Sequence, residues 1–195
     1  LLPTLSQLVA EKKFPEFRAT LREGVGNLIF VNGLAAVLLG VLAEPIVRLL
    51  FEGGEFTALS TLSAAGTVLG LAPGLIAFSL VNILARAFYA TGDTRTPMRI
   101  SIVCLLLNIA LAYALIIPFK GLGLGLANSV TATLNASLLV FALRKKVGRL
   151  DWGELRGQFA AIVGALLVSG LTAWWLVNWW TAQFSHANKW LCLGE

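Results

Sequence analysis

Three charged residues near the end of one apolar stretch share a helical spacing. Glu44, Arg48 and Glu52 stand four residues apart, so a helix would stack them on one face with alternating sign. Such a ladder can neutralise itself at a membrane interface, or it can open and pair again when a protein changes state. The first alternative is structural, and the second makes these residues candidates for an outer gate.

A second set of polar side chains could meet a polar or anionic substrate. Arg86 lies near the end of an apolar stretch, where its guanidinium either reaches the headgroups or faces a water-filled cavity that attracts an anion. Asparagines recur in the apolar stretches. Buried amides hydrogen-bond between helices in lipid, and the alternative is that they line a cavity. Our candidates for a substrate cavity are Arg86, Asn82 and Asn32. The recurring asparagines are Asn32, Asn82, Asn108, Asn128, Asn135 and Asn178.

The residues that carry enzyme chemistry form no recognisable pattern. His186 is the single histidine, and it stands in a polar stretch without a patterned Ser, Cys or acid partner. Cys104 and Cys192 have neither metal-ligand nor CxxC spacing, and we expect two unpaired thiols. No glycine-rich phosphate loop follows a strand. The sequence therefore gives little support to an enzyme, and we expect no cofactor and no metal.

The composition identifies an integral membrane protein. Of the 195 residues, 57% are hydrophobic and 13% are charged, and the mean hydropathy is +0.82. A soluble domain carries about 25% charged residues. The net charge of +5 does not indicate nucleic-acid binding, because no polar segment interleaves basic and aromatic residues.

Five apolar segments are long enough to cross a bilayer, which takes about 20 residues. They are too long and continuous for barrel strands, so we predict an all-α polytopic bundle of about five transmembrane helices. Leu1–Ala10 is interpreted as the end of a sixth helix. We expect a kink at Pro73, and a cap for the third helix from Thr94 or Thr96. The segments are Asn27–Phe51, Thr57–Tyr89, Pro97–Pro118, Leu122–Leu143 and Gln158–Trp180.

The connectors predict both the domain boundaries and the orientation. With alternating helices, twelve of the 15 Lys and Arg residues fall on one side, and Arg48, Lys120 and Lys189 fall on the other. The positive-inside rule makes the twelve cytoplasmic. Residues 1–26 form a helix end with a cytoplasmic amphipathic connector, and residues 27–143 form a four-helix core. Residues 144–157 form a basic cytoplasmic connector, 158–180 the fifth helix and 181–195 a truncated external tail.

Three further segments each leave two interpretations open. Residues 14–24 form either a short amphipathic helix on the cytoplasmic surface or an ordinary connector. The glycines of residues 121–125 (GLGLG) either allow close helix packing or form a flexible entry loop. The tryptophans between residues 174 and 180 form an interfacial belt, or they stack on a sugar.

Four stretches resemble a known family. Leu84–Ile100 (LARAFYATGDTRTPMRI) resembles a connector of the MurJ (MviN) lipid II flippases, within the superfamily of multidrug, oligosaccharidyl-lipid and polysaccharide exporters. Leu1–Gln7, Ala43–Thr57 and Leu134–Lys145 are similar to further helix ends of that family, in the same order. The resemblance covers roughly Leu1–Leu150 and concerns one part of the family's length.

The resemblance implies a function in cell-wall synthesis. Family members have two lobes and move an undecaprenyl-diphosphate-linked peptidoglycan precursor from the inner to the outer leaflet of the bacterial inner membrane by alternating access. This chain would hold most of the second lobe. Its partners would be the precursor, the bilayer, the first lobe and possible cell-wall synthesis enzymes. The alternatives are an O-antigen or polysaccharide flippase, a multidrug exporter of the same superfamily, or a non-transporting scaffold.

Overall fold

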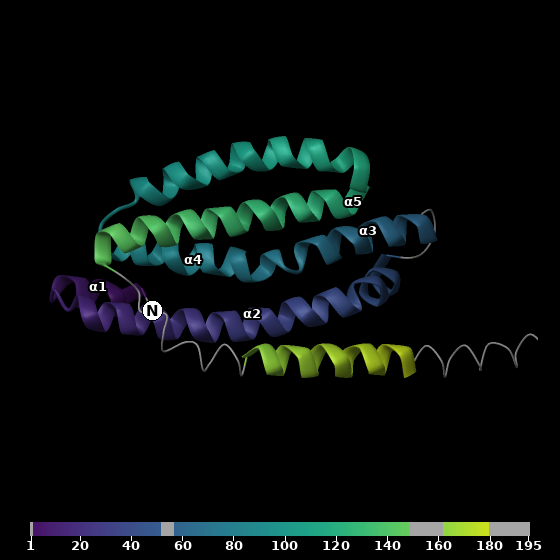
Figure 1. Cartoon of the computed structure of the whole chain (residues 1–195), viewed down its shortest axis with the longest axis horizontal. Helices are drawn as coiled ribbons and strands as arrows, with labels where there is room; N and C mark the ends of the chain where they lie inside the picture. The colour runs from purple at the N-terminus through teal and green to yellow at the C-terminus, as the bar shows by residue number, and fades with distance from the viewer. Residues whose placement is uncertain (1, 52–56, 149–161, 180–195) are drawn as a thin grey trace, which may run out of the picture.

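The computed structural model describes residues 2–51, 57–148 and 162–179 and builds them into a bundle of long helices (Figure 1). This confirms the predicted all-α membrane fold. By length and composition α2, α5 and the Ile162–Trp179 helix are each candidate membrane spans, and α3 with α4 makes a fourth as a bent pair. The labelled helices are α1 (Leu2–Ala10), α2 (Phe14–Phe51), α3 (Ala58–Leu71), α4 (Gly74–Ala90) and α5 (Arg95–Val147).

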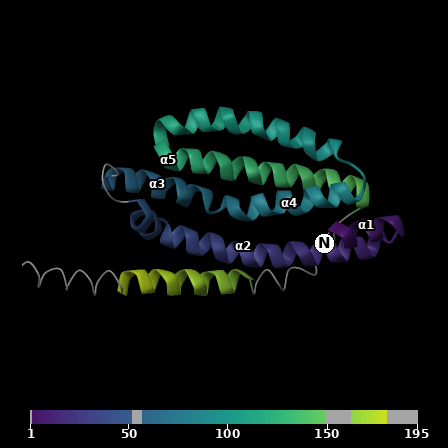
Figure 2. The same ribbon diagram turned by 180° about the vertical axis from the view of Figure 1, so that it is seen from behind.

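Helix α5 consists of two antiparallel arms. Its helical geometry breaks at Lys120, where φ is 51° and ψ is −129°, two residues after Pro118. The chain reverses there, and both views show the arms side by side (Figure 2). Residues 95–119 form the first arm and residues 121–147 the second. The arms correspond to the predicted spans Pro97–Pro118 and Leu122–Leu143.

The predicted span Thr57–Tyr89 is bent near its middle. The helices α3 and α4 meet at an angle of 45° around Ala72 and Pro73. Proline has no backbone N–H and its ring clashes with the preceding turn, so it favours a bend in the helix at this point. The kink predicted at Pro73 is therefore confirmed.

The first turns of α2 correct one sequence interpretation. Residues 14–24 form neither a separate surface helix nor a connector between helices, because α2 runs unbroken from Phe14 to Phe51. Phe17, Leu21 and Val25 are buried on one face of these turns. Burial of that apolar face holds the segment in the bundle. No break in the helix therefore marks the boundary predicted between residues 26 and 27.

The main apolar core lies at one end of the bundle. It joins the start of α2 to α1, the end of α4 and the end of the second arm of α5. Of its large side chains, Phe17 and Leu139 are fully buried and Phe88 is 1% exposed. The core therefore holds these helix ends in place relative to one another.

Glycines bring α3 against the second arm of α5. A Cβ added at Gly125 would lie 2.9 Å from the Cα of Gly70 and would also meet the carbonyl of Thr67. A Cβ added at Gly121 would meet the carbonyl of Ser63. Of the two interpretations of the GLGLG segment, close helix packing is therefore confirmed.

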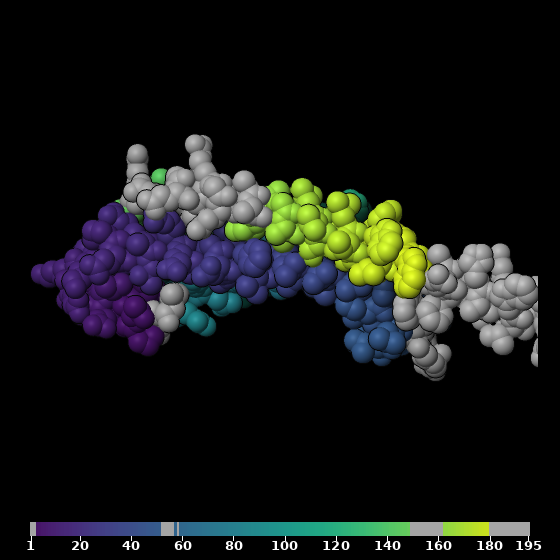
Figure 3. All heavy atoms as spheres, turned by 90° about the horizontal axis from the view of Figure 1, so that it is seen from below, coloured from purple at the N-terminus to yellow at the C-terminus, as the bar shows by residue number. Residues whose placement is uncertain are grey.

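The Ile162–Trp179 helix lies along α2 (Figure 3). A Cβ added at Gly33 would lie 3.1 Å from Leu166, and one added at Gly170 would lie 3.1 Å from Val37. Each helix thus offers a glycine to a branched side chain of the other. The rest of the predicted segment 158–180, most of the connector 144–157 and the whole tail 181–195 lie outside the described residues.

Candidate functional site

One end of the bundle gathers most of the positive charge. Its connectors are tied together, because Lys146 Nζ lies 3.0 Å from Asp93 Oδ2 and Arg18 Nη1 donates to the carbonyl of Val147 at 3.4 Å. Of the described Lys and Arg residues, only Arg48 and Lys120 belong to the other end. We call this region the basic end, and its members are Lys12, Lys13, Arg18, Arg22, Arg86, Arg95, Arg99, Arg144, Lys145 and Lys146.

Asp93 organises the connector between α4 and α5. Its Oδ1 accepts the backbone N–H of Thr96 at 3.0 Å, and its Oδ2 accepts the Thr96 hydroxyl at 2.8 Å. These bonds and the ammonium of Lys146 lower the pKa of Asp93 from its usual 3.8 to about 2. Thr94 stands at the N-cap position of α5 but makes no side-chain cap bond, and Asp93 supplies the side-chain acceptor instead. Neither Thr94 nor Thr96 acts as the predicted side-chain acceptor.

Two of the three substrate-cavity candidates share a face of α4. Asn82 and Arg86 are one helical turn apart, and both are exposed. Leu84, Ala87 and Phe88 hold the opposite face of the helix in the core. The Arg86 guanidinium is thus presented outward near the basic end, where it can attract an anionic group.

The third candidate, Asn32, joins two helices. Its amide oxygen accepts the hydroxyl of Ser79 on α4 at 2.9 Å, and its Nδ2 donates to the carbonyl of Leu28 at 3.0 Å. Asn32 is half-buried, and these bonds use both ends of the amide. The structure therefore does not bring Asn32 together with Asn82 and Arg86 on one exposed face.

The structure contains a polar pocket that was not predicted from the sequence. Asn108 Nδ2 on the first arm of α5 donates to Asn128 Oδ1 at 2.9 Å and to Thr131 Oγ1 at 2.7 Å on the second arm. Asn135 Oδ1 is buried without a hydrogen-bond partner among the described residues. These residues line a pocket of about 220 Å³ between the arms and α4. Its neutral amides and hydroxyls can hold a small polar group.

The recurring asparagines were the sequence feature from which this pocket could have been predicted. Asn108, Asn128 and Asn135 were predicted either to hydrogen-bond between helices or to line a cavity. The structure shows a hydrogen bond between the first two. These residues meet because the chain reverses at Lys120. The sequence alone did not predict which residues of the two arms would face each other. The lone thiol of Cys104 also lines the pocket, whereas Cys192 lies outside the described residues.

Two of the three outer-gate candidates, Glu44 and Arg48, form an ion pair. Arg48 Nη2 lies 2.9 Å from Glu44 Oε1, one turn away on α2, and both side chains are about half exposed. Glu52 lies outside the described residues. An exposed pair of this kind contributes at most about 1 kcal/mol to stability.

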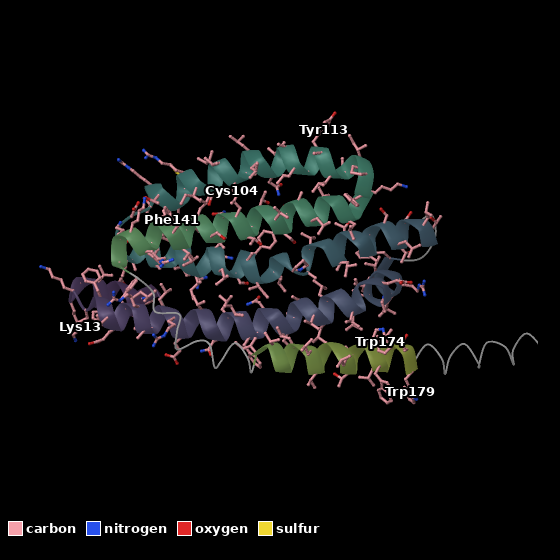
Figure 4. The ribbon with its side chains drawn as sticks, viewed as in Figure 1. Lys13, Cys104, Tyr113, Phe141, Trp174 and Trp179 are labelled. Atoms are coloured by element: carbon pink, nitrogen blue, oxygen red, sulfur yellow. The ribbon has the colours of Figure 1, made fainter. Side chains whose placement is uncertain are left out.

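Tryptophans lie near the C-terminal end of the Ile162–Trp179 helix. The rings of Trp175 and Trp179 stack with centroids 6.5 Å apart, and Trp174 is 61% exposed. Figure 4 shows Trp174 and Trp179 far from Lys13, which belongs to the basic end. Exposed aromatics at one end of an apolar helix are typical of a membrane interface. Trp180 lies outside the described residues.

Comparisons with known proteins place these features in one family. The family model for the lipid II flippase MurJ matches residues 1–192. The Probable lipid II flippase MurJ of Haemophilus influenzae is 33% identical over 92% of this chain. The Lipid II flippase MurJ of Burkholderia cenocepacia is 34% identical over 94% of it.

A solved structure shares the fold. The chain superposes on a lipid II flippase MurJ in an inward closed conformation with a TM-score of 0.64 and 21% sequence identity, over 89% of this chain and 40% of that one. The chain spans 36% of the length of each of the two relatives named above. It matches the family model along nearly its whole length, and the chain therefore belongs to the MurJ lipid II flippase family.

Proposed function

We propose that this chain forms part of a flippase that moves lipid II from the inner to the outer leaflet of a bacterial inner membrane. The observation that carries the proposal is the match of the family model over residues 1–192. The relatives are named flippases, which are transporters, and on this proposal the protein is a transporter and not an enzyme. The remaining length of the relatives would supply the other lobe.

The physical task of such a protein is to carry a charged, sugar-bearing headgroup across hydrocarbon. An unpaired charge in the bilayer centre costs several kcal/mol at least, so polar groups of the protein must replace its hydration. The lipid tail needs no such replacement and can stay in the bilayer. Alternating access between two lobes exposes the polar path to one leaflet at a time.

The basic end is the part of this chain suited to face the cytoplasm. Ten of the described basic residues belong to it, and positive charge on short connectors is typical of cytoplasmic loops. Arg86 and Asn82 would then line the route of the anionic headgroup as it enters from the cytoplasmic leaflet. Asn32 would support α4 from behind through Ser79.

The opposite end would close the route on the outer side. Glu44 and Arg48 are paired there, and Glu52 continues the same spacing. An exposed ion pair exchanges partners at little cost, which is what a gate requires. The further partners in this proposal are the bilayer and, beyond it, enzymes of cell-wall synthesis.

Complementation tests the proposal. The protein at its full natural length is expressed in bacteria depleted of their own lipid II flippase, and growth with normal cell shape is the expected result. Cells that express the protein in the membrane at normal level and still lyse would contradict a lipid II flippase. Rescue of an O-antigen flippase mutant instead would assign the chain to that substrate.

A further inference from the structure

A cavity of about 840 Å³ lies between α2 and the Ile162–Trp179 helix. Its volume falls within the range of roughly 300 to 1,000 Å³ that is usual for small-molecule sites. It is unlike the polar pocket between the arms of α5, because seven of its nine lining residues are apolar. The lining residues are Val41, Leu42, Glu44, Pro45, Arg48, Leu49, Leu176, Val177 and Trp179.

The packing of the two helices explains where the cavity opens. They touch through Gly33 with Leu166 and through Val37 with Gly170, and Ala173 is still buried. Beyond these small residues the larger side chains of Leu176 and Trp179 face α2 across the cavity. The space therefore begins where the close contact ends, near the end that carries the tryptophans.

The two charged residues of the lining lie at the rim of this apolar space. Glu44 and Arg48 are paired at 2.9 Å with side chains 49% and 58% exposed, so both remain accessible to a ligand. Pro45 has no backbone N–H to donate to the carbonyl of Val41, which belongs to the same lining. The rim therefore offers a carboxylate and a carbonyl as acceptors, and a guanidinium as donor, within two turns of helix.

We propose that this cavity binds a membrane phospholipid with a zwitterionic headgroup. An acyl chain fills the apolar space, the phosphate binds Arg48, and the ammonium binds Glu44 and the Val41 carbonyl. An anionic headgroup without an ammonium would place its negative charge near the Glu44 carboxylate and add no cation to offset the repulsion. The stacked rings of Trp175 and Trp179 belong to the same end of the helix, as expected at headgroup level. This site does not depend on the proposed transport.

The test compares two lipids with identical acyl chains. The protein at its full natural length is delipidated, incubated with phosphatidylethanolamine or phosphatidylglycerol, and examined by native mass spectrometry. We expect about fivefold stronger retention of phosphatidylethanolamine, which is what one additional exposed ion pair with the ammonium can contribute. Arg48→Gln is expected to lower retention of both lipids. Glu44→Gln is expected to remove the preference, because the acceptor for the ammonium is gone. Glu11→Gln, which removes an exposed ion pair at the basic end, is the matched control and is expected to change nothing.

A second variant fills the space without changing charge. Val177→Trp is expected to lower phosphatidylethanolamine retention, whereas Leu171→Trp, on the same helix but outside the lining, is not. Photoreactive phosphatidylethanolamine with a diazirine in its acyl chain should label residues 41–49 or 176–179 of the wild-type protein. Equal retention of the two lipids by the wild type, or labelling confined to other segments, would overturn the proposal.

Discussion

The hydroxyl of Ser129 donates a 2.6 Å hydrogen bond to the backbone carbonyl of Gly70. Ser129 lies on the second arm of α5 and is 6% exposed, and Gly70 lies in the last turn of α3. Carbonyls at the end of a helix lack intrahelical donors, and no water is present in the bilayer core to replace them. The second arm of α5 thus supplies the donor that the break at Pro73 removes from α3.

Loss of that hydroxyl should weaken the bundle. We expect Ser129→Ala to lower the free energy of unfolding by about 1 kcal/mol, since a buried carbonyl loses its partner. Thermal unfolding of the full-length protein in detergent measures the change. Ser137→Ala is the control, because the exposed Ser137 hydroxyl donates to the carbonyl of Thr133 on its own helix and not to a neighbouring helix among the described residues. Equal melting temperatures for the two variants would contradict a role of Ser129 in supporting the kink.

Close packing of α3 on α5 predicts opposite effects of one substitution at two glycines. Gly125→Ala should destabilise the protein by about 1 to 3 kcal/mol, because its Cβ meets backbone atoms of α3 that have no room to move. Gly164→Ala should be neutral or stabilising by up to about 1 kcal/mol, because nothing lies within 4 Å and alanine favours helix. Unfolding of both variants in the same detergent gives the comparison, and a harmless Gly125→Ala would show that the helices are not in contact there.

Asp93 should make stability depend on acid pH. Its pKa falls from 3.8 to about 2 on folding, so its stabilising effect is complete above about pH 4 and disappears as the pH falls toward 2. Asp93→Asn keeps a good capping residue but loses the ion pair with Lys146, and should flatten stability across this pH window. Asp93→Ala loses the cap as well and should cost about 1 kcal/mol more than Asp93→Asn at neutral pH. Unfolding curves recorded from pH 2 to 7 measure both effects, and an unchanged acid profile in Asp93→Asn would assign the dependence to other groups.

A double-mutant cycle separates the two roles considered for Asn32. If Asn32 serves mainly to link α2 to α4, Asn32→Ala and Ser79→Ala should show a coupling of about 0.6 kcal/mol in the free energy of unfolding. Additive effects of the two substitutions would remove the structural role. A loss of complementation by Asn32→Ala with unchanged stability would then support contact with substrate.

Arg86 is an exposed cation of α4 that would line the proposed substrate route. We expect Arg86→Ala to reduce translocation by about tenfold, which corresponds to about 1.4 kcal/mol, and to impair growth complementation. Arg99→Ala removes an exposed cation at the same end, on α5 instead of α4, and should leave both nearly unchanged. Membrane levels of the variants must match. Full complementation by Arg86→Ala at normal expression would reject its role.

The sequence predicted those features that depend on local chemistry. Apolar length predicted the helices, and Pro73 predicted the bend because proline acts on its own helix. It failed where tertiary contacts decide. Nothing local showed that Phe17 and Leu21 would be buried against α4 and α5, so the start of α2 was interpreted only as a surface helix or a connector.

The candidate site shows the same division. The i, i+4 pair of Glu44 and Arg48 was predicted from spacing within one helix and is present. The partners of Asn32 and Asn108 lie 47 and 20 residues further along the chain, and their pairing depends on helix register. Asp93 was not predicted as the cap, because Thr94 and Thr96 lie nearer to the predicted start of the helix at Pro97.

Transport itself is measured most directly in liposomes. The protein at its full natural length is reconstituted, fluorescent lipid II is placed in one leaflet, and its appearance in the other leaflet is followed with an impermeant quencher. Our account predicts protein-dependent translocation that is reduced by Arg86→Ala and retained by Arg99→Ala. The protein used must complement a depleted strain or be shown to remain correctly folded. If such protein moves lipid II no faster than protein-free liposomes do, the result would contradict our account.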